Sequence, residues 1–231
     1  MQFSIMQTEV RDRLTILSTS TYITTAIIKR WLNMALYWAC SFKKWPFMEK
    51  RRDDLIDSTG TYPYPTGIKT GSIYLITVNG KRYQKIAYED YLKYLEEHSS
   101  GDDKVWAEFD RNVYINGNAC SVGDAVYFYG QEVATEMSLD ADTSPFEDAE
   151  DAGDEAIIRK AVSIGLKKLG GHDPEAKLEE EEAKGILEMI WDRIVETKPR
   201  TVRKARPLLQ KINMLEGTVG ESGQDTVGKF K

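Results

Sequence analysis

Residues 22–42 read YITTAIIKRWLNMALYWACSF and form the longest continuous run rich in aliphatic and aromatic side chains in this 231-residue chain. Lys29, Arg30 and Asn33 interrupt the run on one side, so we expect a water-facing helix rather than a membrane span. Pro46 ends the run, because it has no N–H to donate and disfavours helix in the residue before it. The stretch predicts a core helix over residues 22–43. Its apolar positions recur at spacings of three and four: Ile27, Ile28, Trp31, Leu32, Ala35, Leu36, Trp38 and Ala39.

Three tryptophans, Trp31, Trp38 and Trp45, lie seven residues apart, a spacing that places them on one face of a helix. Large aromatic side chains at helical spacing are more often core than ligand surface, so we interpret them as packing residues. The predicted core-facing set of this helix is Trp31, Leu32, Ala35, Trp38 and Trp45.

Three further helices are predicted on either side of the core helix. Residues 7–17 form a short amphipathic pattern, and residues 155–169 end at Gly170-Gly171, a common helix stop. Residues 174–197 begin with Pro174 in the first turn. The face of this last helix that we expect to close on the core helix comprises Leu178, Ile186, Met189, Ile190 and Ile194.

Between residues 60 and 132 the spacing of apolar residues changes from the helical period to the alternation typical of strands. Ile73–Val78 and Lys81–Ala87 flank Asn79-Gly80, the pair favoured where both central turn residues need positive φ. A short helix over 88–97 follows, then a second hairpin around Asp110-Arg111 and a strand over 124–132. The alternation predicts a small antiparallel β subdomain.

The expected fold class is therefore α+β and mainly α: a bundle of about four helices with an inserted small antiparallel β subdomain and an extended C-terminal tail. Residues 1–198 form the main domain, with an acidic loop at 133–154 that has few packing residues. Residues 199–231 form a basic tail.

Charge is segregated along the chain, although the net charge is only -6. Residues 133–154 contain no Lys or Arg, whereas residues 198–211 contain six basic residues and no acid. Blocks of like charge often serve as interaction segments, although solvated surface is the simpler explanation.

No pattern of catalytic or metal-binding residues stands out. Cys40 and Cys120 lie eighty positions apart without CxxC spacing, and His98 and His172 both fall in polar, loop-like surroundings. No phosphate-binding loop or nucleophile elbow is present, and the acids of residues 133–154 do not match the EF-hand spacing. We therefore expect no enzyme, no cofactor and no metal, and a cytoplasmic site of synthesis because residues 1–10 do not resemble a signal peptide.

Several motifs occur in an order that is typical of one family. Trp31-Leu32-Asn33-Met34-Ala35 leads to Trp45-Pro46-Phe47, then to the extended 61–65 segment, later strands at 113–115 and 126–129, and two closing helices. In this order and spacing, over about residues 7–195, the chain resembles the head-to-tail adaptor (head-completion) proteins of tailed bacteriophages. The chain departs from the family in two places: it lacks the usual proline near the end of the first sheet strands, and its acidic loop is long. The tail, residues 199–231, matches no segment typical of the family.

The resemblance implies a structural virion protein in the phage neck, made in the host cytoplasm. Such proteins form a ring, here expected to have twelve copies, that docks on the portal protein, extends the DNA channel and is a platform for tail or stopper proteins. The implied partners are the portal, neighbouring copies and tail components, with packaged DNA only as channel contents and no membrane. The family has no active site.

Two segments are candidates for contacts within such a particle. The acidic loop would suit a channel-facing place, where like charge keeps DNA from adhering. The tail is expected to dock on the portal as an ordering arm, or else to remain a solvated end. Its candidate portal-binding residues are Arg200, Arg203, Lys204, Arg206, Leu208, Leu209 and Ile212.

Three alternatives stay open. Another neck or tail-completion protein, such as a stopper, would be smaller and dominated by β structure. A nucleic-acid-binding regulator would use the basic ends, but the sequence pI of 5.2 and the lack of a helix-turn-helix with a basic second helix disfavour it. An enzyme with an unfamiliar site is the third.

Overall fold

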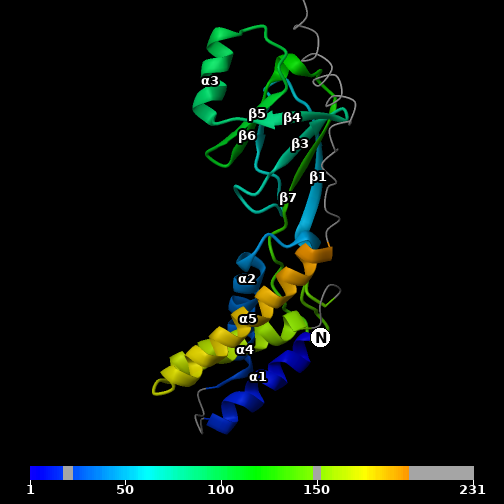
Figure 1. The fold of residues 1–231 in the computed structure, drawn as a ribbon. Coiled ribbons are helices and arrows are strands. Elements are labelled where there is room, and N and C mark those ends of the chain that lie inside the picture. Colours follow the sequence, from blue (N-terminus) through cyan, green and yellow to red (C-terminus); the bar gives the residue numbers. More distant parts are fainter. Residues whose placement is uncertain (18–22, 148–151, 198–231) are drawn as a thin grey trace, which may run out of the picture. The chain divides into compact units, whose positions relative to one another are not determined.

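A computed structural model describes residues 1–17, 23–147 and 152–197 of the chain (Figure 1). Residues 1–193 form one compact unit, and a second unit, of which only the end of the last helix is described, begins at Ile194. The tail residues 199–231 lie outside the described residues.

Four helices make up the helical part of the first unit: α1 (Phe3–Leu17), α2 (Thr25–Phe42), α4 (Ala152–Leu169) and α5 (Asp173–Thr197). α2 and α1 both pack on α4 and on each other. α1 buries Phe3, Met6, Val10 and Leu14, whose spacings of three and four give it one apolar face. The Thr24 hydroxyl caps α2 by accepting a hydrogen bond from the N–H of Ile27 at 3.4 Å.

α2 is shorter at its end than the sequence suggested, which changes the role of Trp45. The helix stops at Phe42, and Lys43 is extended, so Trp45 does not lie on the helix face with Trp31. Its indole N–H donates to the carbonyl of Ala39 at 2.8 Å, and the short 3₁₀ helix η1 (Pro46–Met48) follows. The fully buried Trp45 ring packs against Phe146 at 5.3 Å between centroids and so covers the end of the helix.

The β part is a seven-stranded sheet in the order β1-β7-β3-β4-β5-β6-β2, curled into a half-barrel. Helix α3 (Tyr88–Glu97) packs beside β5, and the 3₁₀ helix η2 (Gly117–Ala119) precedes β7. The strands are β1 (Glu49–Leu55), β2 (Thr61–Pro63), β3 (Leu75–Val78), β4 (Lys81–Lys85), β5 (Val105–Phe109), β6 (Asn112–Ile115) and β7 (Ala125–Gln131).

The expected bundle of about four helices with a small antiparallel β insert is therefore wrong: the described residues contain five α-helices and a large mixed sheet. One reason for the wrong prediction is β1. Its sequence, EKRRDDL, has no alternating apolar positions because it is an edge strand paired only with β7. The other is α3, which is the crossover of a β-α-β unit and makes β4 and β5 parallel, with Gln84 opposite Val105.

The two predicted hairpins are present. Asn79 and Gly80 have φ of 48° and 74° between β3 and β4, and Asp110 and Arg111 have φ of 45° and 59° between β5 and β6. Positive φ at both central residues fits the right-handed twist of the strands. The core of the sheet is aromatic and β-branched: Tyr62, Ile76, Tyr83, Trp106, Val113, Ile115, Val126 and Phe128 are all buried.

The acidic loop is packed, contrary to expectation. Met137, Ser144 and Phe146 are buried, and α4 begins at Ala152, within the predicted loop. The side-chain amide of Asn33 pairs with the backbone of Met137 at 2.9 Å in both directions: the amide N–H donates to the carbonyl, and the backbone N–H donates to the amide oxygen. We call residues 132–147 the strap, because they connect β7 across α2 toward α4.

The predicted core face of α5 is correct at Ile190 and wrong at Leu178 and Met189. Its buried residues are Ala176, Ala183, Leu187 and Ile190, whereas Leu178 and Met189 are 56% and 47% exposed. Ala176 and Ala183 belong to this inner face, and the Ser163 hydroxyl of α4 donates to the carbonyl of Ala176 at 2.7 Å. The large apolar residues of α5 therefore divide between an inner and an outer face.

We predict that Asn33→Ala lowers the free energy of unfolding by about 2–4 kcal/mol, because it leaves the buried N–H and C=O of Met137 without partners. Urea unfolding followed by circular dichroism measures this. The matched control is Asn118→Ala, which removes one exposed side-chain hydrogen bond, to Ser99. An equal loss in both variants would contradict the role assigned to Asn33.

Candidate functional site

The side chains that most often act in catalysis or bind metals, cysteine and histidine, are few and do not cluster. Burial raises the pKa of the Cys40 thiol to about 12, and burial likewise raises the pKa of Cys120. His98 stacks on the ring of Tyr94 at 5.0 Å between centroids. Within residues 1–17, 23–147 and 152–197, no three or more His, Cys, Asp or Glu side chains gather as a metal site, and no helix is long and apolar enough to cross a membrane.

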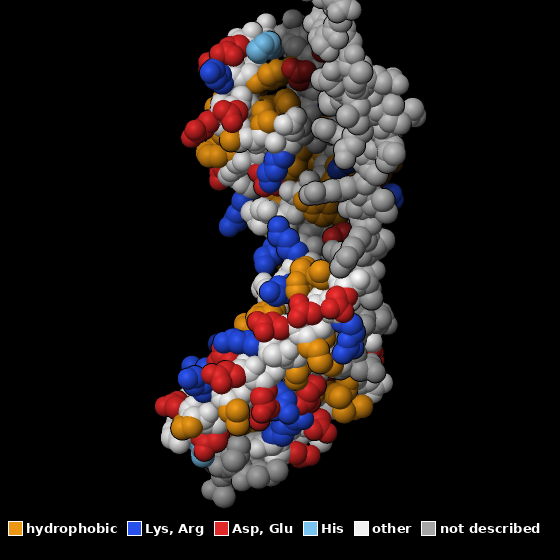
Figure 2. All heavy atoms as spheres, in the orientation of Figure 1, with side chains coloured by type: hydrophobic (Ala, Val, Ile, Leu, Met, Phe, Trp, Pro, Cys, Tyr) orange, Lys and Arg blue, Asp and Glu red, His pale blue; other side chains and the backbone are white. Residues whose placement is uncertain are grey.

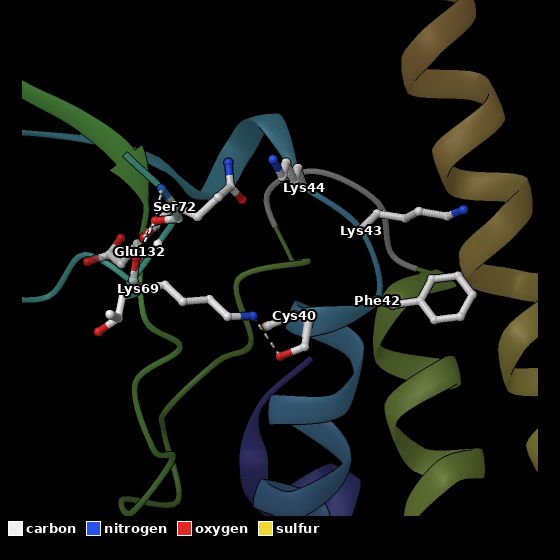
Figure 3. Close-up of a pocket in the computed structure, with 11 residues that line it drawn as sticks. Cys40, Phe42, Lys43, Lys44, Lys69, Ser72 and Glu132 are labelled. Carbon is white, nitrogen blue, oxygen red and sulfur yellow. Dashed lines mark hydrogen bonds between the residues drawn. The ribbon is translucent and has the colours of Figure 1, made fainter. Parts of the chain in front are cut away.

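A shallow pocket of about 290 Å³ lies between the end of α2 and the turn before β3 (Figure 3). Lys43, Lys44 and Lys69 line it together with Glu132. Lys69 donates to the Ser41 hydroxyl at 3.4 Å, and the Lys43 ammonium lies 5.9 Å from the Trp191 ring centroid. Since two of its three lysines already have intramolecular contacts, the pocket connects these segments rather than presenting a prepared anion site.

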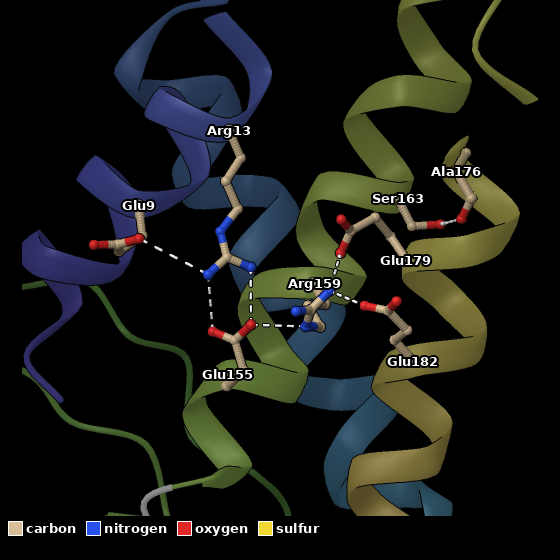
Figure 4. A network of polar contacts seen from close by, with 8 residues as sticks. All are labelled: Glu9, Arg13, Glu155, Arg159, Ser163, Ala176, Glu179 and Glu182. Carbon is tan, nitrogen blue, oxygen red and sulfur yellow. Dashed lines mark hydrogen bonds and ion pairs between the residues drawn. The ribbon is translucent and has the colours of Figure 1, made fainter. Parts of the chain in front are cut away.

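The helices are joined by a network of ion pairs (Figure 4). Arg13 of α1 makes two hydrogen bonds of 2.9 Å to Glu155 of α4, which raise the pKa of the arginine. Arg159 lies 2.7 Å from the same carboxylate and 3.0 Å from Glu179 of α5, and it also pairs with Glu182. The network fixes α1, α4 and α5 to one another, so its charges are structural.

α2 has an outer face that this packing does not use. Ala26, Arg30, Met34, Tyr37 and Ser41 recur at spacings of four, four, three and four, opposite the buried face of the helix, and all five are exposed. Met34 and Tyr37 are 46% and 42% exposed. Together with Met137 of the strap they line an open groove of about 430 Å³. Apolar side chains in an exposed groove are typical of protein contact surfaces.

α5 has a corresponding outer face. Leu178, Gly185 and Met189 lie opposite its buried residues, with the acids Glu182 and Asp192 at intervening positions. On the side seen in Figure 2, hydrophobic side chains lie among acidic and basic ones over α5.

The sequence-predicted residues fall into two groups. Trp31, Leu32, Ala35 and Trp45 are buried, while Trp38 is half-buried under the Lys160 ammonium, 4.9 Å from its ring centroid. The candidate portal-binding residues Arg200, Arg203, Lys204, Arg206, Leu208, Leu209 and Ile212 lie outside the described residues.

Sequence reasoning missed the outer face of α2 and assigned Leu178 and Met189 of the α5 outer face to the core. The repeat of residues 26, 30, 34, 37 and 41 is visible in the sequence, but the stronger apolar repeat of the buried face conceals it. No protein-family model and no curated protein sequence matches the chain.

We predict a pH-dependent contribution from Glu180. Hydrogen bonds from Lys167, at 2.6 Å, and Lys160, with a further contribution from Lys184, lower the pKa of this carboxyl to about 2. A carboxyl with a lowered folded-state pKa stabilises the fold above its unfolded pKa of roughly 4.3, and this contribution is lost as the pH falls toward 2.

Glu180→Gln should therefore be less stable than the unsubstituted protein by about 1 kcal/mol at pH 7, and the difference should shrink between pH 4.5 and 2. Thermal unfolding across this pH range measures the effect. The control Glu181→Gln changes an acid that is 60% exposed and 3.7 Å from Lys177, and should alter stability little. A difference for Glu180→Gln that does not vary with pH would contradict the assignment.

Proposed function

We propose that the protein is a non-enzymatic assembly component of the neck of a tailed bacteriophage, an adaptor that forms a ring on the portal and presents a platform for tail components. The observation that carries the proposal is that the helical part has a complete core yet exposes apolar side chains on the outer faces of two helices, α2 and α5. A protein that acts alone has little use for two such faces.

The family resemblance supports the same function, because its residues have identifiable structural roles. Trp31 lies in the helical core, Asn33 holds the strap, and Trp45 covers the end of α2 where the chain turns into the sheet. The residues that carry the resemblance thus lie in one structural unit, and this supports the proposal.

Association with a portal complex is the direct test. We expect purified protein, mixed with the portal protein encoded by the same phage genome, to join it as a ring, seen as an increase in mass by light scattering and as an added layer in negative-stain images. Multivalency allows modest contacts per copy to give a stable ring. A protein that remains monomeric and apart from the portal would refute the adaptor function, and salt-dependent DNA binding would then favour the regulator.

The tail hypothesis gives a separate prediction. Replacing Arg200, Arg203, Lys204 and Arg206 with Ser should weaken portal association about tenfold or more, because charge-matched docking loses four cations. The matched control removes four exposed cations of the described residues, with the substitutions Lys81→Ser, Arg82→Ser, Lys104→Ser and Lys168→Ser. Equal portal binding by both variants, or unchanged binding after deletion of residues 199–231, would dispose of the docking arm.

A further inference from the structure

The outer faces of α2 and α5 match each other in charge. α2 contains Lys29 and Arg30 and no acid, and Lys29 is already paired with Asp140 at 3.1 Å. Arg30 has no ion-pair partner within residues 1–17, 23–147 and 152–197. On α5, Glu182 is engaged by Arg159, whereas Asp192 has no ion-pair partner within the same residues. Arg30 and Asp192 are therefore unpaired among the described residues. The other members of the α2 stripe are apolar or small, whereas the α5 stripe also holds the paired acid Glu182, and Glu188 of α5 is a further exposed carboxylate without an ion-pair partner in the described part of the chain.

The two stripes also match in length and shape when the helices run antiparallel. Arg30 then lies opposite Asp192, Met34 opposite Met189, and Tyr37 opposite Gly185. From Arg30 to Ser41 the α2 stripe extends about 16 Å, and from Asp192 to Glu182 the α5 stripe extends about 15 Å, at 1.5 Å per residue. A Cβ placed on Gly185 meets nothing within 4 Å, so the surface there is open to a large side chain.

The outer faces of α2 and α5 cannot contact each other within one copy. The buried face of α2 packs on α4, and α5 is joined to α4 through Ser163 and Arg159, so each outer face points away from the helix that both share. Two different faces that fit one another make a head-to-tail contact, which closes into a ring when the rotation between copies permits.

We propose that the outer face of α2, with the groove beside the strap, receives the outer face of α5 from the next copy in antiparallel register. This inference rests on the proposed ring and names the two surfaces that form it. Tyr37 enters the gap at Gly185, the two methionines pack together, and Arg30 pairs with Asp192 of the neighbour. The strap residue Met137 supplies the wall of the groove.

Disulfide trapping between two variants, each with one introduced cysteine in addition to the retained Cys40, tests the contact. Full-length Met34→Cys and Met189→Cys proteins, both with Cys120→Ser, are mixed in equal amounts with the portal protein and oxidised, and the linked peptides are quantified by mass spectrometry. Cys40 is retained, since its raised pKa of about 12 keeps the thiol protonated. We expect the 34–189 link to exceed, at least tenfold, the link formed when Val122→Cys replaces Met34→Cys; Val122 is 73% exposed.

The outcomes separate this inference from the proposed function. Portal-bound rings without the 34–189 link would overturn the contact and leave the adaptor function standing. If the unsubstituted protein neither joins the portal nor forms rings, the adaptor function and the contact fail together.

A charge exchange provides a second measurement that does not depend on cysteine chemistry. Arg30→Glu alone and Asp192→Arg alone should each reduce the yield of portal-bound rings several-fold, whereas the double variant should restore it. Arg82→Glu, an exposed reversal on β4, is the control for net charge. A double variant with yields as low as the single variants would overturn the pairing of Arg30 with Asp192.

Discussion

The pairing of the Asn33 amide with the backbone of Met137 is the constraint on which the helical part depends. A chain segment that crosses the core of a protein must satisfy its backbone polar groups, and the amide does so in both directions at a buried position. Its consequences extend along the strap: Phe146 reaches the ring of Trp45, and the Ser144 hydroxyl donates to the buried carboxylate of Asp154 in the first turn of α4. The position of Asn33 on α2 thus determines where the strap, and after it α4, can pack.

Local features were predictable because a few neighbouring residues determine them. Asn79-Gly80 formed its turn because both residues tolerate positive φ, and Gly170-Gly171 end α4 with φ of 76° each. The helical pattern of residues 22–43 gave most of the buried face for the same reason, since Ile28, Leu32, Ala35 and Ala39 recur at spacings of four, three and four. Asn33, expected on the polar side of the helix, is buried as well. The same pattern wrongly placed Trp45 on the face of this helix, because periodicity cannot show that the backbone becomes extended at Lys43.

The features that were missed depend on partners distant in sequence. The charges of β1 indicate no strand until β7 is known to lie beside it, and the parallel pairing of β4 with β5 follows from how α3 crosses between them. The strap was taken for a loop because it has few packing residues, yet Met137 and Phe146 are buried and hold it against the helices. In α5, two alanines share the inner face with Leu187 and Ile190, so apolar size alone did not distinguish this face from the outer one. The candidate contact faces were missed with them.

The charged side chains of the helical part are of two kinds: some form ion pairs within one copy, and others have no ion-pair partner among the described residues. Arg13, Glu155, Arg159 and Glu179 satisfy one another across three helices, so they stabilise the subunit and contribute little to recognition of a partner. Arg30 and Asp192 have no such partners among the described residues, and each lies on a stripe whose other members are mainly apolar or small. An exposed apolar stripe with one charge gives weak affinity but specifies register, since a shifted partner would leave that charge against apolar surface. Weak, register-specific contacts would suit the proposed adaptor, in which multivalency among copies gathered on the portal supplies the remaining affinity.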